Sequence, residues 1–181
     1  LGDVYKRQAF YGSKLETVYF GCDHVVLINS TTFPKQNMTV MVPAKMVSQY
    51  ASGRPKEVWE SCNGSLPVPV GKMLQKIKVS RDPDKMAYQQ GDTISLEGMS
   101  VTFQYPHSTM DSDYEALIKD ELGEYLTATP CDGDVFDESM DGEPIQLVYD
   151  DGYTRLVAYS KDNLQQAAYE YAKLMPNYYL Y

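Results

Sequence analysis

The chain has few of the residues that most enzymes and metal proteins use for chemistry. Its 181 residues include two histidines and three cysteines, Cys22, Cys62 and Cys131. An odd number of cysteines gives no closed disulfide framework, and no C-x-x-C pair with zinc spacing occurs. Cys22 and His24 are close in sequence, but two ligands make a weak metal site. The motifs G-x-S-x-G, G-x-x-x-x-G-K-[ST] and H-E-x-x-H are also missing. We therefore expect no enzyme, no cofactor and no metal centre.

Long apolar runs and positive charge are scarce as well. No apolar run approaches the roughly 18 residues of a membrane-spanning helix, so we expect no membrane insertion. The net charge is −9. Residues 9–73 carry six Lys or Arg against four Asp or Glu, whereas residues 74–181 carry eight against twenty. Such an acidic field repels phosphate backbones, and we expect no nucleic-acid partner.

The first eight residues form a segment of a different kind. The run Asp3-Val4-Tyr5-Lys6-Arg7-Gln8 resembles the in-frame translation of a transposase-end adapter used for sequencing libraries. We expect residues 1–8 to be artefactual and unstructured, and the chain to be a fragment of a longer protein. A native start is the alternative.

Residues 9–63 contain an internal repeat. Val18-Tyr19-Phe20 recurs 22 residues later as Val40-Met41-Val42. A period in the low twenties is typical of leucine-rich repeats, with one strand and a turn in each coil. The run A-F-Y-G-x-x-L-x-x-V-x-F at residues 9–20 resembles the BspA-type leucine-rich repeat. Residues of a second copy are Val25, Ile28, Phe33, Val40, Val42 and Pro43. The resemblance implies the end of a solenoid.

Two short helices are predicted after this repeat. Pro43 suits the first turn of a helix, because the N–H that it lacks is not needed there. Met46, Val47 and Tyr50 then share one face. A second helical turn at residues 56–61 adds Trp59. These helices would cover the open end of the solenoid, as terminal caps do.

Strand alternation divides the repeat into an inner and an outer face. Leu15, Val18 and Phe20 are expected to point inward. The exposed face of the strands is where repeat proteins usually bind. The candidate ligand-contact residues on that face are Glu16, Thr17, Tyr19 and Met41, with Met41 beside Tyr19 on the next coil.

Residues 64–73, rich in Pro and Gly, read as a linker to a second domain at residues 74–160. Three alternating apolar runs follow, at residues 77–79, 94–96 and 101–105, with turn residues between them. Period-2 alternation interrupted by turns is typical of an antiparallel β-sandwich.

The sequence of residues 83–105 resembles the start of the bacterial Ig-like (Big) domain. That start has the pattern P-x-K-x-x-Y-x-x-G-D, followed by L-x-G-h-x-V-x-x-x-Y, where h is an apolar residue. The matching residues are Pro83, Lys85, Tyr88, Gly91, Asp92, Leu96, Gly98, Met99, Val101 and Tyr105. Residues 136–159 resemble the end of the same domain, with an Asp151-Gly152 hairpin turn. A strand is expected at residues 125–128.

Two further segments carry predictions. The loop containing Asp132, Asp134, Asp137, Glu138 and Asp141 is expected to be a solvated acidic loop. Its spacing fails the EF-hand pattern, and a looser calcium site is the alternative. Residues 161–181 are predicted to form a C-terminal helix and tail. That helix would begin at a capping pair, Asp162 and Gln165, and end at Pro176.

Together these patterns predict a mainly β chain: a truncated solenoid end with a short capping helix, an Ig-like sandwich and a C-terminal helix. By architecture we expect a non-catalytic adhesion segment, extracellular or on a bacterial surface. The repeats would contact a host or bacterial surface protein or glycan, and the Ig-like domain would be a spacer or a second adhesive module. Two alternatives are an accessory region of a larger secreted enzyme and a phage virion decoration protein.

Overall fold

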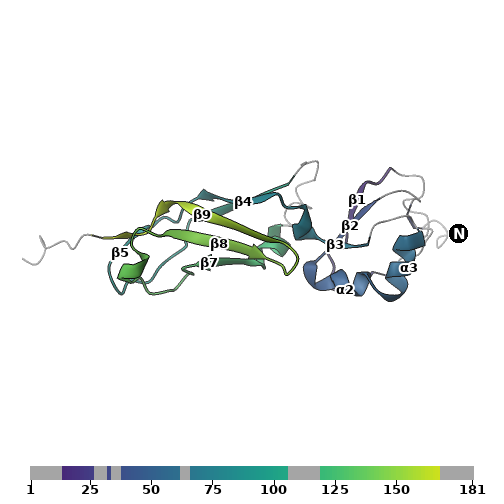
Figure 1. Ribbon diagram of the computed structural model, residues 1–181, viewed down its shortest axis with the longest axis horizontal. Coiled ribbons are helices and arrows are strands. Elements are labelled where there is room, and N and C mark those ends of the chain that lie inside the picture. The colour runs from purple at the N-terminus through teal and green to yellow at the C-terminus, as the bar shows by residue number, and fades with distance from the viewer. Residues whose placement is uncertain (1–13, 27–31, 34–37, 62–65, 106–118, 168–181) are drawn as a thin grey trace, which may run out of the picture. The chain divides into compact units, whose positions relative to one another are not determined.

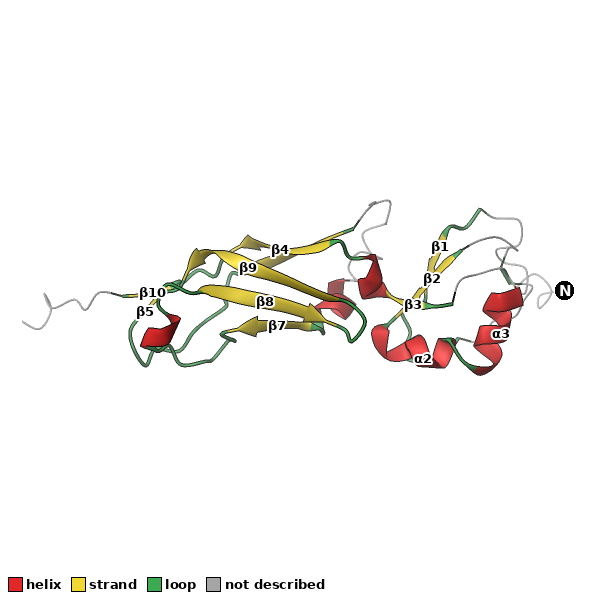
Figure 2. Ribbon diagram, viewed as in Figure 1, coloured by secondary structure: helices red, strands yellow, loops and turns green. Residues whose placement is uncertain are grey.

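The computed structural model describes residues 14–26, 32–33, 38–61, 66–105 and 119–167 (Figure 1). Strands predominate over helices in these residues (Figure 2), which confirms the predicted mainly β fold. The chain divides into two compact units. The first comprises Leu1–Lys76, Gln104–Leu126 and Tyr149–Leu156, and the second comprises Ile77–Phe103, Thr127–Val148 and Val157–Tyr181. The predicted domain limits, which are continuous in sequence, stay a prediction.

A parallel three-stranded sheet lies in the first unit. Its order is β1 (Thr17–Tyr19), β2 (Thr39–Val42) and β3 (Val68–Pro69). In β1 and β2, Val18 pairs with Val40 and Tyr19 with Met41. This register equals the 22-residue spacing of the repeat in the sequence, so the predicted alignment of the two strands is confirmed.

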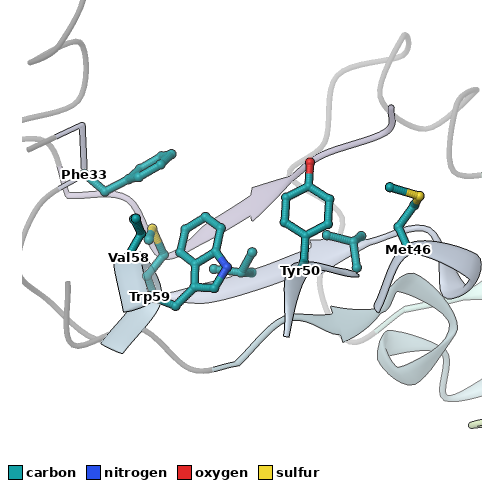
Figure 3. Close-up of a cluster of buried hydrophobic side chains, with 8 residues drawn as sticks. Phe33, Met46, Tyr50, Val58 and Trp59 are labelled. Carbon is teal, nitrogen blue, oxygen red and sulfur yellow. The ribbon is translucent and has the colours of Figure 1, made fainter. Parts of the chain in front are cut away.

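Short helices follow β2, as predicted. They are η1 (Ala44–Met46), α2 (Val47–Tyr50) and α3 (Gly53–Ser61). Tyr50 and Trp59 from these helices are 0 % exposed, and their rings turn toward the strands (Figure 3). The buried cluster consists of Phe33, Met38, Val40, Val42, Met46, Tyr50, Val58 and Trp59. Leu15, Val18 and Phe20 pack against it, as predicted.

A close approach of backbone to side chains occurs at Gly71, within η2 (Val70–Met73). The buried Tyr149 hydroxyl donates to Asp151 Oδ2 at 2.8 Å. Burial, reinforced by this carboxylate, raises the pKa of the Tyr149 hydroxyl. A Cβ atom at Gly71 would overlap both the hydroxyl oxygen and Asp151 Oδ2. No residue with a Cβ atom therefore fits at this position unless the Tyr149–Asp151 pair moves.

We predict that Gly71→Ala destabilises the protein by about 1–3 kcal/mol, because the new methyl group overpacks a buried hydrogen-bonded pair. Gly123→Ala is the matched control, since a Cβ atom there meets nothing within 4 Å. Its free energy of unfolding should be unchanged or slightly raised. Urea unfolding of both variants measures the difference, and equal effects would contradict the steric argument.

The remaining strands form antiparallel pairs and one parallel pair. β4 (Lys76–Arg81) pairs with β6 (Ser100–Gln104). β8 (Pro144–Asp150) lies between β7 (Leu126–Thr129) and β9 (Arg155–Asn163), as Figure 1 shows. The four residues between β8 and β9 allow only an antiparallel hairpin. β7 begins one residue after the predicted strand start. The predicted alternation holds on β8, where Ile145, Leu147 and Tyr149 are buried.

The core of the second unit is built around Tyr88, in β5 (Ala87–Tyr88). The buried residues of this cluster are Tyr88, Ile94, Phe136, Ile145 and Leu164. The Tyr88 ring stacks on Phe136 with centroids 5.7 Å apart. Its hydroxyl accepts from the Ser95 amide at 3.1 Å and lies 2.9 Å from the Lys85 carbonyl oxygen. The Tyr88 hydroxyl thereby holds the backbone before it, at Lys85, and the backbone after it, at Ser95.

The predicted strand at residues 94–96 is wrong. Only an isolated antiparallel bridge, Thr93 to Val135, forms there. The Ile94 amide still donates to the Asp134 carbonyl oxygen at 2.8 Å, but the amides of the two residues after it bind side chains instead of a neighbouring strand. Ser95 donates to the Tyr88 hydroxyl, and Leu96 donates to Asp132 Oδ1 at 2.8 Å. Ile94 still points inward and is 1 % exposed.

The predicted helix starting near residue 161 is also wrong over the described residues. β9 continues to Asn163, and β10 (Gln165–Gln166) pairs in parallel with β5. Leu164 is 0 % exposed within the core cluster. Burial of this leucine and pairing with Ala87 and Tyr88 outweigh the local capping pattern. The predicted helix beyond residue 167 lies outside the described residues.

We predict that Tyr88→Phe lowers the free energy of unfolding by about 1–3 kcal/mol, because it leaves the partly buried Ser95 amide without its hydroxyl partner. Tyr153→Phe provides the matched control, since Tyr153 is 58 % exposed. Its effect should stay within about 0.5 kcal/mol. Chemical denaturation compares the two. A Tyr88→Phe variant as stable as the unmodified chain would show that the hydroxyl does not hold the loop.

Candidate binding surfaces

The predicted contact face on the repeat strands is only partly exposed. Glu16 and Thr17 are exposed, and Tyr19 is half-buried. Met41 is 1 % exposed, so its predicted place on an exposed contact face is wrong. It lies on the central strand β2, between Tyr19 on β1 and Val68 on β3. Val40 and Val42, which alternate with it on the other face of the strand, are buried as well, so both faces of β2 are covered. Ligand contact by the other three residues stays a prediction.

An acidic cleft of about 180 Å³ opens beside Tyr19, within the first unit. Its lining residues are Tyr19, Gly21, Cys22, Asp23, Pro43, Lys45, Asp120, Glu121 and Glu124. Glu121 Oε1 accepts from the Ala44 amide at 3.1 Å. Burial foremost raises the pKa of Glu121, and the charge of Glu124 adds to the effect. The cleft therefore disfavours a full set of ionised carboxylates.

We predict that Glu121→Gln raises the melting temperature at pH 7. The pKa of Glu121 is raised in the folded protein, so its stabilising contribution is complete below its unfolded pKa, about 4.3. That contribution is lost as the pH rises through the folded pKa. Glutamine stays neutral and keeps an oxygen for the Ala44 amide. The gain over the unmodified chain should disappear near pH 4.

Thermal unfolding between pH 4 and pH 8 measures this difference. Glu57→Gln serves as the control, because Glu57 is exposed on α3. A constant offset at all pH values, or a Glu57→Gln effect of equal size, would contradict the assignment to Glu121.

Carboxylates of the acidic loop hold backbone amides. Asp132 Oδ1 accepts from Leu96, and Asp134 Oδ2 from the Cys131 amide at 2.8 Å. Asp137 caps η3 (Glu138–Met140) through Ser139, and Asp141 Oδ1 accepts from Gln166 at 2.7 Å. These hydrogen bonds lower the pKa of Asp134 and of Asp137. The carboxylates of this acidic loop thus stabilise local turns and a helix start by accepting hydrogen bonds from backbone amides.

Metal ligands do not gather in the described part of the chain. No group of three or more His, Cys, Asp or Glu side chains is placed to hold a metal ion in residues 14–26, 32–33, 38–61, 66–105 and 119–167. His24 Nδ1 lies 2.9 Å from Asp23 Oδ1, and their interaction lowers the pKa of Asp23. Cys22 and Cys131 are free thiols, and Cys62 lies outside the described residues.

The outer face of the β7–β8–β9 sheet carries exposed apolar side chains. Val157 is 42 % and Tyr159 is 54 % exposed. Gln146 Nε2 on β8 donates to the Tyr159 hydroxyl oxygen at 3.1 Å. The same hairpin register sets Val148 opposite Val157. The result is an apolar strip across two neighbouring strands.

A groove of about 480 Å³ adjoins this strip, within the second unit. Apolar surface makes up most of its lining. The lining residues are Thr129, Pro130, Asp134, Ser139, Met140, Glu143, Pro144, Gln146, Tyr159 and Leu164. The volume lies within the usual range of ligand pockets. We call the groove and the strip Val148–Val157–Tyr159 together the outer-face site.

The alternation of residues along β9 is a sequence signal for part of this site. In β9 Leu156 and Ala158 alternate with Val157 and Tyr159, so an inward position of the first pair places the second pair outward. Apolar side chains on the outer face of a strand indicate a contact surface when they are contiguous. The groove itself depends on Pro130, Met140 and Pro144, which different segments bring together, and no local pattern reveals it.

Comparison with protein-family models, with curated proteins and with solved structures found no match to this chain. No helix in the described residues has the length and apolar character needed to cross a membrane.

Proposed function

We propose that this chain is a non-catalytic binding segment of a secreted or surface-anchored bacterial protein. It would hold the end of a BspA-type leucine-rich repeat array and an Ig-like module. Its partner would be a host or bacterial surface protein or glycan. In this proposal the Ig-like module is itself adhesive, through the outer-face site.

The exposed strip that ends at the groove carries this proposal. Val157 and Tyr159 expose large fractions of their side chains on a regular sheet rather than on a loop. A rigid sheet costs little ordering entropy on binding, and a tyrosine ring supplies contact area with few rotatable bonds. Glu16, directly before β1, and Thr17 on β1 offer a second exposed surface, as the repeat resemblance implies.

The test immobilises the full 181-residue chain and measures binding to panels of extracellular matrix proteins and glycans. Two double variants locate the contact: Val157→Ser with Tyr159→Ser, and Glu16→Ala with Thr17→Ala. We expect the first pair to weaken binding at least about tenfold, since an anchor side chain contributes more than about 1 kcal/mol.

Tyr153→Ser is the control, because it removes an exposed tyrosine from the β8–β9 turn. If binding were lost only in the Glu16→Ala, Thr17→Ala variant, the contact would lie on the repeat strands and not at the outer-face site. A folded chain that binds no member of either panel would contradict the adhesive function.

A further inference from the structure

The charged side chains that line the groove of the outer-face site are all acidic. Asp134 and Glu143 line the groove, and no Lys or Arg is among its lining residues. Asp134 already accepts from the Cys131 amide, whereas the exposed Glu143 carboxylate makes no hydrogen bond or ion pair with the described residues. Lys161 is two residues beyond Tyr159 on β9, and its ammonium group donates a hydrogen bond to the Ser80 carbonyl oxygen. The groove is therefore complementary to a cation.

The Tyr159 ring is held in a position suited to a cationic side chain. Its hydroxyl oxygen is fixed by Gln146, while about half of the side chain remains exposed. The face of a tyrosine ring attracts an ammonium or guanidinium group within about 6 Å of its centroid. Glu143 and Tyr159 line the same groove. One Lys or Arg side chain could therefore meet a carboxylate and an aromatic face together.

Apolar surface extends beyond this cation position. Pro130, Met140 and Pro144 line the groove. Val157 continues the exposed surface along β9, about 7 Å from Tyr159, which is the two-residue repeat of a strand. A short extended peptide has the same side-chain repeat.

Resting on the proposed function, we propose that the outer-face site binds an extended peptide segment with a Lys or Arg side chain flanked by apolar residues. The cation lies between Glu143 and the Tyr159 ring. The neighbouring apolar side chains occupy the proline-lined groove and the valine strip.

The test selects a phage-displayed random heptapeptide library on the full chain, then measures the enriched peptides as fluorescent probes by anisotropy. We expect peptides with Lys or Arg beside Pro, Leu, Ile or Val. Tyr159→Ser should weaken their Kd about tenfold, and Glu143→Gln about threefold. Replacing the peptide cation by Gln should weaken it similarly, and added salt should weaken binding further.

Tyr153→Ser and Glu138→Gln are the matched controls, and both should leave Kd unchanged. Enrichment of neutral or acidic peptides, or no enrichment, would overturn the proposal. Retention of a neutral oligosaccharide from the glycan panel in a Tyr159-dependent manner, with no cationic peptide enriched, would also overturn it. In that last case the adhesive function would stand while the ligand class would change.

Discussion

Tyr88 ties a stretch with little regular secondary structure to the core of the second unit. The ring is fully buried against Phe136, while the hydroxyl binds backbone groups at Lys85 and Ser95. A buried hydroxyl without partners is costly, so the ring and the loop must be placed together. The Lys85 ammonium adds a bond to Asp92 Oδ2 at 3.0 Å, and that carboxylate also accepts from the Gln89 amide. These contacts give a physical reason for the P-x-K-x-x-Y-x-x-G-D pattern.

Local patterns in the sequence were enough to predict the elements whose burial follows from their own periodicity. Val18 and Val40 are 22 residues apart, and they pair in register. Ile145 and Leu147 alternate with polar neighbours, and both are buried. In each case the pattern of one strand sets which face enters the core, and no distant residue is needed to decide it.

Features that depend on residues distant in the chain could not be predicted from the sequence. Met41 is buried although it alternates with the core residues Val40 and Val42, so both faces of β2 are covered, and the pattern of one strand does not reveal the second cover. Leu164 lies in a segment whose capping pattern predicts a helix. It is instead buried in a core whose other fully buried residues come from four distant segments. The candidate binding site divides in the same way. Tyr159 could be placed outward by counting along the strand, whereas the groove beside it could not be foreseen.

The chain's single tryptophan has a consequence for how the protein can be studied. Trp59 is fully buried in the first unit, in contact with the rings of Phe20 and Phe33. The second unit holds tyrosines and no tryptophan. Selective excitation of the indole therefore reports on the first unit alone, while circular dichroism records both. The molecule thus carries an internal fluorophore that can show, without labelling, whether its two units unfold in one transition or in two.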